Sequence, residues 1–282
     1  YVSAPIGILT LGQTLCLISG NFDLSIAQNT SLSALVIELI VGRALPGVLP
    51  APIAIMLVLI LGGLLGAANG FFVGKVKINS FLVTLSTYLI YKFTAFHLLS
   101  QPIAGFYLPS SFLALGNWKL GPIRFVFIVF LLIAVLLYFL IMYTPFGVKL
   151  YATGSDKTSA DSLGIDTGNV ELWAYTLAGV LAGVAGLAYV GQAGSVTNSL
   201  ASGEVFWSFA GAILGGVSMS GGRGRIFGAM GGALLLGVIS AGVLLLNIPP
   251  NLRDVIKGLV VLAAVLIGKY RRTLMDRLLM PS

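Results

Sequence analysis

The sequence predicts an all-α, polytopic transmembrane helical bundle, and three observations support this prediction. Hydrophobic residues make up 57% of the chain and charged residues only 9%, with a mean hydropathy of +1.02, so too little polar surface remains to cover a soluble globule. Long apolar stretches recur, several of them reaching the roughly 20 residues that a helix needs to cross a hydrocarbon core of about 30 Å. These stretches lack strand-like alternation, and lipid accepts only helices or closed barrels.

Nine apolar stretches are candidate spans, and a single transmembrane domain accounts for residues 1–282. Two of the stretches are short for a full crossing. In chain order the candidates are about 4–20, 26–42, 52–74, 81–99, 123–143, 170–190, 205–221, 227–246 and 254–268.

The positive-inside rule predicts the orientation in a plasma or inner membrane. Residues 144–168 and the C-terminus are expected to be cytoplasmic, which places Tyr1 outside. Because the chain opens without an initiator methionine or polar lead, we expect at least one N-terminal helix to be missing; a cleaved signal peptide is the alternative. The expected cytoplasmic side carries Lys75, Lys77, Lys149, Lys157, Arg223, Arg225, Lys269, Arg271, Arg272 and Arg277, and the opposite side Arg43, Lys119, Arg124 and Arg253.

Small residues at regular spacing predict tight helix packing. Gly62, Gly66, Gly70 and Gly74 recur every four residues and therefore share one helical face, where the small side chains let another backbone approach closely. A surface along which helices slide is the alternative interpretation. Similar spacing occurs at Gly179 and Gly183, at Ala182 and Gly186, and at Gly224, Gly228 and Gly232.

The chain offers little to catalysis or to cofactors. A single histidine, His97, and a single cysteine, Cys16, cannot build a zinc cluster or a Cys/His dyad. The glycine-rich residues 215–225 lack the Gly-Lys-Ser/Thr ending of a phosphate loop. We therefore expect a protein that is not an enzyme, binds no metal or cofactor, does not hydrolyse ATP by itself and has no nucleic-acid partner.

Polar residues within the spans are candidates for a permeation pathway, because each is costly in lipid unless it faces protein or water. For Lys92 the alternative is that its long stem snorkels to the interface, and Glu38 is expected at the interface near an outer helix end. The pathway candidates are Gln13, Asn29, Asn69, Lys92 and Asn247.

Carboxylates that could drive a gradient-coupled carrier are not expected in the middle of the spans. Asp23 falls at a cytoplasmic turn, and Glu204 and Asp254 fall at outer helix ends. Such carriers commonly use mid-membrane carboxylates as relays or ion ligands. The sequence therefore indicates that energy comes from a partner.

The polar segment 144–168 contains a short helix with a signal at each end. Asp156 is a good N-cap, and Lys157 to Leu163 provide about two turns of helix. Gly164 suits the left-handed position after the helix, where Ile165 can then contact Ala160. We interpret this helix as a rigid element that docks onto a partner.

Residues 147–165, GVKLYATGSDKTSADSLGI, resemble the cytoplasmic loop of ABC-importer permeases of the ribose and monosaccharide type, a group that in its wider sense includes branched-chain amino-acid permeases. That loop reads approximately G-R-x-x-x-A-x-G-x-N-x-x-A-A-x-x-x-G-I. The chain departs from it at Val148, Asp156 and Ser159; only the arginine replaced by Val148 leaves a contact in doubt. The resemblance implies an ATPase-docking helix that uses Gly154, Asp156, Ala160, Leu163, Gly164 and Ile165.

Further stretches in the same order resemble the family along most of the chain. GNFDLSIA at 20–27 is similar to its G-G-I-D-L-S-V-G turn, and GGVSMSGGRG at 215–224 to its G-G-T-S-x-x-G-G-x-G turn. NSFLVTL at 79–85 and IKGL at 256–259 also resemble family segments. Family members have ten helices, with the D-L-S turn after the second, which implies that this chain starts at the second helix.

The resemblance implies a permease subunit of an ATP-driven importer that works by alternating access. Its implied partners are cytoplasmic ATPase subunits that use the ATP, an extracytoplasmic substrate-binding protein, a second copy or a homologous permease, and the lipid bilayer. A monosaccharide or related small polar solute is the expected cargo. A self-sufficient carrier or channel is the main alternative, and an intramembrane enzyme is a third.

Overall fold

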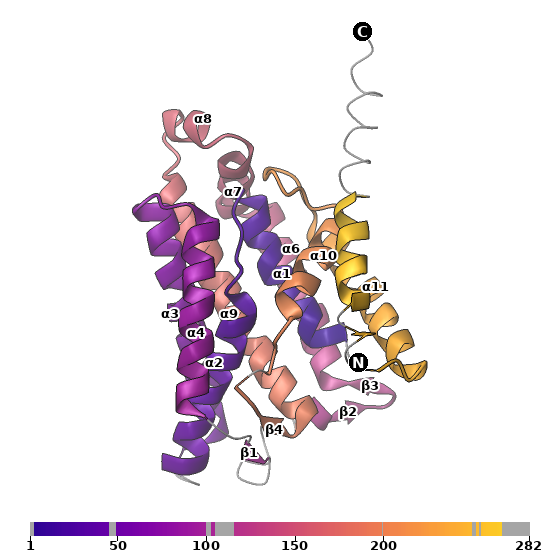
Figure 1. The fold of residues 1–282 in the computed structure, drawn as a ribbon. Helices are drawn as coiled ribbons and strands as arrows, with labels where there is room; N and C mark the ends of the chain where they lie inside the picture. Colours follow the sequence, from indigo (N-terminus) through magenta and orange to yellow (C-terminus); the bar gives the residue numbers. More distant parts are fainter. Residues whose placement is uncertain are drawn as a thin grey trace.

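The computed structural model describes residues 3–44, 49–99, 103–104, 116–198, 200–249, 252–253 and 255–266, which form an all-α transmembrane bundle (Figure 1). Its helices are α1 (Ser3–Ile18), α2 (Ile26–Glu38), the π-helical η1 (Leu39–Ala44), α3 (Ala51–Gly70), the π-helical η2 (Phe71–Lys75), α4 (Ser80–Leu98), α6 (Phe125–Tyr143), α7 (Pro145–Ser155), α8 (Lys157–Ser162), α9 (Thr167–Ala193), α10 (Glu204–Leu214), α11 (Ile226–Leu245) and the helix Val255–Leu266.

Each of the nine predicted spans corresponds to a helix, but the helices differ in their capacity to cross a bilayer. Four are long and apolar enough, namely α3 continued by η2, then α6, α9 and α11. Four more are apolar but shorter, at Ser3–Ile18, Ile26–Val41, Glu204–Leu214 and Val255–Leu266. The remaining helix, α4, has 19 residues and carries several Ser and Thr residues and Lys92, which make it less apolar.

The span predicted at 205–221 was too long, because α10 ends at Leu214. Gly216 adopts φ +85° and its N–H donates to the Ile213 carbonyl, while the Val217 N–H donates to the Ala212 carbonyl. These two bonds form a Schellman motif, which satisfies the last carbonyls of a helix and stops it. The glycine pair that begins the 215–224 turn therefore sets the end of α10.

The bundle has two distinct ends. Helices α7 and α8 lie at one end, here called the α8 end, and the short strands lie at the other, the strand end (Figure 1). There β1 (Ile103–Ala104) pairs antiparallel with β4 (Ser195–Val196), and β2 (Lys119–Leu120) pairs with β3 (Ile123–Arg124). The α8 end is the one that the basic residues predict to be cytoplasmic, although Asp254 and the basic tail from Lys269 lie outside the described residues.

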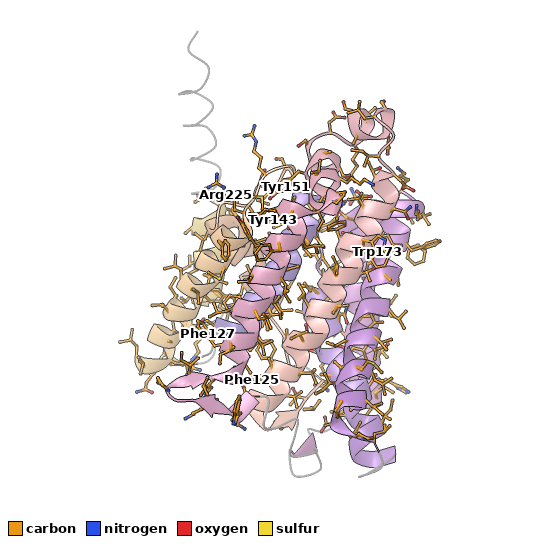
Figure 2. The ribbon with its side chains drawn as sticks, turned by 180° about the vertical axis from the view of Figure 1, so that it is seen from behind. Phe125, Phe127, Tyr143, Tyr151, Trp173 and Arg225 are labelled. Atoms are coloured by element: carbon orange, nitrogen blue, oxygen red, sulfur yellow. The ribbon has the colours of Figure 1, made fainter. Side chains whose placement is uncertain are left out.

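Helix α9 is the centre of the bundle. It packs against α3, α1 and α2. In the most apolar 18-residue stretch of α9, 72% of the residues are buried, compared with 28% in the corresponding stretch of each of the other three long spans. Many large side chains of α3, α4, α6 and α11 instead remain exposed, among them Leu64, Phe93, Leu132 and Val238. Figure 2 shows α6 along the back of the bundle, with Phe125 and Phe127 towards the strand end and Tyr143 at the α8 end. A largely buried central helix surrounded by helices whose apolar side chains face outward is the pattern expected in lipid.

The predicted glycine face of α3 packs against α9. A Cβ added at Gly62, Gly66 or Gly70 would collide with the backbone of α9 at Gly179, Tyr175 or Leu172, and one at Gly74 would meet Gly168. The two predicted stripes, 62–74 and 179–183, are therefore halves of one interface within the chain. The other stripes also meet partners inside the chain, because Gly186 packs on Thr30 of α2 and Gly232 on Gly211 of α10.

Candidate functional site

The short helix predicted after Asp156 is present as α8, with both predicted caps. The Asp156 carboxylate accepts a hydrogen bond from the Ser159 N–H at 2.7 Å. At the other end Gly164 has φ +81°, the Ile165 N–H donates to the Ala160 carbonyl at 3.1 Å and the Gly164 N–H to the Asp161 carbonyl at 3.0 Å. This is a Schellman motif, so local hydrogen bonds hold α8 at both ends.

The residues before α8 form a helix that the sequence did not predict. Helix α7 begins at Pro145, a residue favoured in the first helical turn, and ends at Ser155, so the 144–168 segment is a helical hairpin rather than a loop with one helix. Sequence reasoning missed α7 because its apolar residues are few and its Gly147 and Gly154 have low helix propensity.

The six predicted docking residues divide into exposed and buried groups. Asp156, Leu163 and Gly164 are exposed, and the Leu163 side chain is 81% accessible. Gly154 and Ala160 are buried, and Ile165 is half-buried against the main core. The first three are therefore accessible to a partner, whereas Gly154 and Ala160 are enclosed within the chain.

Carboxylates secure the connection from α8 to α9. The Asp161 carboxylate accepts a hydrogen bond from the Thr167 hydroxyl at 2.7 Å, and Lys75 lies 3.2 Å from the Asp166 carboxylate. The pKa of Asp161 is lowered, chiefly by the Thr167 hydroxyl, and the pKa of Asp166 is lowered by the Asn169 N–H and then by Lys75. Both carboxylates are therefore charged at neutral pH. Asp161 ties α8 to the start of α9, and Asp166 ties the start of α9 to Lys75 of η2.

Three segments that the sequence singled out separately meet at the α8 end: the 20–27 turn, the 215–224 turn and the α7–α8 hairpin. Gly154 packs directly on the backbone of Ile18 and Gly222, with Gly20 also close, and the Gly222 N–H donates to the Ile18 carbonyl at 2.9 Å. The Tyr151 hydroxyl donates to the Gly224 carbonyl at 2.6 Å, and Figure 2 shows Tyr151 and Arg225 at this end of the bundle. The 20–27 turn, the 215–224 turn and the α7–α8 hairpin thus form one junction with almost no space between backbones.

An ion pair connects α8 to the buried centre of the bundle. Lys157, the first residue of α8, pairs with the carboxylate of Glu171 in α9, whose side chain is only 2% exposed. The Asn21 amide also donates to Glu171, at 2.7 Å, and its oxygen lies 3.5 Å from the Lys157 nitrogen. Sequence reasoning missed Glu171, and the available signal was a carboxylate near the start of an otherwise apolar span.

The five predicted pathway residues are not brought together. Gln13, Asn29 and Asn69 are buried; Asn29 donates to the Gly62 carbonyl at 3.0 Å and Asn69 to the Ser25 hydroxyl at 2.7 Å. The Gln13 amide, oriented to satisfy both of its groups, bonds to the backbone of Asp23. These three amides connect α1, α2 and α3 through the interior.

The other polar candidates lie elsewhere. The Lys92 ammonium lies 5.7 Å from the centre of the Tyr88 ring, and the Lys92 side chain is partly exposed. Asn247 is exposed with φ +52°, just beyond the end of α11, so its expected place inside a span was wrong. Glu38 was expected at the interface but is 3% exposed, because the chain continues into η1 without a break.

Comparison with known proteins agrees with this architecture. The sequence model of the family described as branched-chain amino acid transport system / permease component matches residues 1–265. The autoinducer 2 import system permease protein LsrC of Escherichia coli (strain K12 / DH10B) is 32% identical over 283 residues, covering 98% of this chain and 80% of that protein. LsrC of Photorhabdus laumondii is 30% identical, covering 94% and 78% respectively. No solved structure shows significant similarity.

A bundle of apolar helices with a capped polar hairpin at one end is the architecture of an integral membrane protein. The chain belongs to the branched-chain amino acid transport system permease family, and it is a membrane permease subunit of an ABC importer. The resemblance noted in the sequence is thereby confirmed.

Proposed function

We propose that this permease carries a monosaccharide or a related small sugar-like solute and is driven by a separate ATPase that docks on α8. The relatives named above are described as autoinducer 2 import permeases, which supports a small polar cargo. The absence of a Gly-Lys-Ser/Thr phosphate loop from the sequence supports a partner as the source of ATP hydrolysis. An extracytoplasmic binding protein would deliver the solute, and a second permease would complete the pathway.

The single observation that carries the docking proposal is the form of α8. It is capped at both ends, presents Leu163 to solvent and is attached to the bundle through Lys157, Glu171 and Asn21. An element that is rigid in itself passes on a displacement instead of absorbing it. A push on α8 would therefore reach Glu171 in α9, and α9 contacts α1, α2 and α3.

The turn at Gly164 provides the test. Gly164→Val should break the C-terminal cap of α8, because φ +81° costs a non-glycine residue about 1–2 kcal/mol, which lowers the capped population roughly tenfold. Solute uptake per ATP hydrolysed should fall several-fold in vesicles that contain the permease, its ATPase and the binding protein. A Cβ at Gly164 would meet no atom within 4 Å, so we expect the effect to come from the backbone conformation.

Gly121→Val is the matched control. Gly121 has φ +63° in the β2–β3 turn at the strand end, and a Cβ there also meets no atom within 4 Å. This variant should keep its coupling ratio. If Gly164→Val transports with wild-type coupling, the docking role of α8 is wrong.

A further inference from the structure

A pocket of about 190 Å³ lies between the last turns of α9, the start of α10, the second half of α11 and the helix Val255–Leu266. Helix α10 begins partway along the bundle instead of at the strand end, so Glu204 does not occupy the outer helix end that the sequence predicted (Figure 1). The pocket is smaller than the roughly 300–1,000 Å³ of sites for drug-sized ligands, so it suits a small solute. None of its residues belongs to the α8 junction.

Trp207 is the residue that points to a ligand. Its side chain is 3% exposed and lines the pocket, yet among the described residues its indole N–H has no hydrogen-bond acceptor. Buried tryptophan N–H groups normally find a partner, because an unpaired donor away from water is costly. An oxygen atom of a molecule in the pocket would satisfy this donor.

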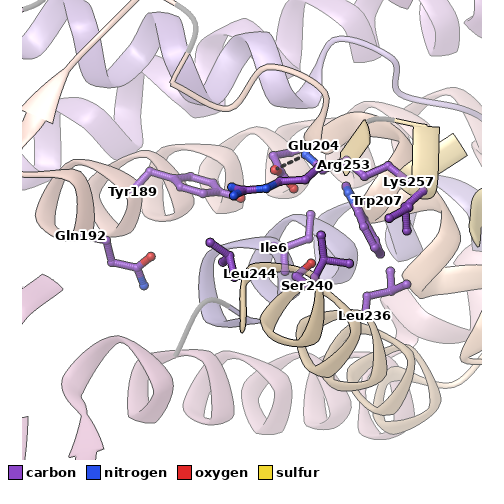
Figure 3. A pocket seen from close by; sticks show the side chains of 12 residues that line it. Ile6, Tyr189, Gln192, Glu204, Trp207, Leu236, Ser240, Leu244, Arg253 and Lys257 are labelled. Atoms are coloured by element: carbon purple, nitrogen blue, oxygen red, sulfur yellow. Dashed lines mark ion pairs between the residues drawn. The ribbon is translucent and has the colours of Figure 1, made fainter. Parts of the chain in front are cut away.

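Charged side chains line one side of the pocket and apolar ones the other. Figure 3 shows Glu204, Arg253 and Lys257 along one side, with Leu236 and Leu244 opposite and Trp207 between Lys257 and Leu236. Lys257 lies 3.6 Å from the Glu204 carboxylate, and Arg253 donates through Nε to the Ile248 carbonyl at 2.7 Å. These anchors fix the charged groups in place around the cavity.

We infer that this pocket is a binding site for a neutral polyhydroxylated solute within the permease. Such a molecule has an apolar C–H face that can lie against Trp207 and Tyr189, and hydroxyl groups that both donate and accept. The indole N–H, Arg253 and Lys257 supply donors, while Glu204 and Gln192 supply acceptors. Because Glu204 already pairs with Lys257, that carboxylate does not require a cationic ligand.

This inference rests on the proposed function, since it identifies where the proposed cargo binds. It adds a site in the membrane subunit itself, separate from the extracytoplasmic binding protein. A solute held here would contact α9, the same helix that receives Lys157 from α8. The start of α9 would then respond to closure of the ATPase, through Lys157 and Glu171, and the end of α9 to binding of solute in the pocket.

Tryptophan fluorescence provides a direct test on the full chain. Trp118 and Trp173 are 54% and 55% exposed, so Trp118→Phe and Trp173→Phe should leave the fold intact and Trp207 as the single fluorophore. This double variant is reconstituted in phosphatidylcholine vesicles and titrated with D-ribose or L-leucine up to roughly 50 mM, enough to saturate a site with a Kd of about 1 mM. We expect a saturable change in Trp207 emission with ribose and not with leucine.

A second variant tests whether the ribose response depends on the residues that line the pocket. Gln192→Ala removes one polar group from the rim of the pocket and should weaken the ribose response at least several-fold. A saturable response to leucine alone, or no response to either solute, would overturn the inference. If the response is absent while ATP-coupled sugar uptake by the complete transporter persists, the pocket is wrong and the proposed function stands.

Discussion

At the scale of single residues, the Lys157–Glu171 pair joins one buried side chain to one that is partly exposed. The Glu171 side chain is buried at 2% exposure, whereas that of Lys157 is 44% exposed. Losing the lysine therefore leaves a buried carboxylate without its countercharge, while losing the carboxylate releases a lysine that water can solvate. The two partners should differ in their effect on stability and on coupling.

A double-mutant cycle measures this asymmetry. Lys157→Met should destabilise the fold by about 2–3 kcal/mol, towards the level of breaking a buried ion pair, whereas Glu171→Gln should cost about 1 kcal/mol because a glutamine oxygen can still accept from Asn21. The double variant should resemble Glu171→Gln. Thermal unfolding in detergent checks the order of the three variants.

The exposed pair between Lys75 and Asp166 provides the control for that cycle. Its side chains are 36% and 56% accessible, so Lys75→Met should cost no more than about 1 kcal/mol. Equal losses for Lys157→Met and Lys75→Met would show that the buried carboxylate has no special role.

The cap at Asp156 predicts how α8 responds to pH. The Ser159 N–H lowers the pKa of Asp156 below its ordinary value of 3.8, so the charged form that caps α8 is favoured in the folded protein. The stabilisation is fully present above about pH 4 and is lost as pH falls through the lowered pKa. Hydrogen exchange at the Ser159 amide should show constant protection from neutral pH to about pH 4 and a decline below it. Asp156→Asn should keep the cap without this decline, and Asp156→Ala should lose protection at every pH.

At the scale of secondary-structure elements, the α3–α9 interface depends on the absence of side chains. Gly66→Ala would place a Cβ against the Tyr175 carbonyl and Gly179, neither of which can move without shifting α9. We expect a loss of about 1–3 kcal/mol in the free energy of unfolding, the usual range for overpacking. Thermal unfolding measures the effect.

Gly231 is the matched control on α11. A Cβ there would meet no atom within 4 Å, and alanine is the better helix former by about 1 kcal/mol, so Gly231→Ala should leave stability unchanged or raise it slightly. A Gly66→Ala protein as stable as Gly231→Ala would refute the close contact between α3 and α9.

At the scale of the whole molecule, the proposal that a separate ATPase supplies the energy predicts that the permease alone does not accumulate solute. Vesicles that contain only this chain should show no concentrative sugar uptake on addition of ATP, whereas addition of the ATPase and the binding protein should restore it. Radiolabelled sugar accumulation distinguishes the two preparations. Uptake by the chain alone would contradict the need for a separate ATPase.

The elements differ in how far sequence could predict them. The capped helix α8 followed from Asp156 and Gly164 because its hydrogen bonds join residues within six positions of each other. The length of α10 did not, since the predicted span ran on to 221, through the Gly215–Gly216 pair at which the backbone turns. Hydrogen bonds between residues close in the sequence can be predicted from those residues, whereas hydropathy alone does not show where a glycine turn ends a helix.

The sequence by itself determined the membrane class, the capped helix and the glycine stripe, because composition, capping and four-residue spacing are local properties of the chain. Tertiary structure decided which residues act together. Asn21 and Glu171 are 150 positions apart, and neither signals the other. Gln13, Asn29 and Asn69 share the interior, but Lys92 and Asn247 do not join them. Such contacts form when helices that are distant in the sequence pack together, and the spacing of residues within one helix does not reveal which other helix it will meet.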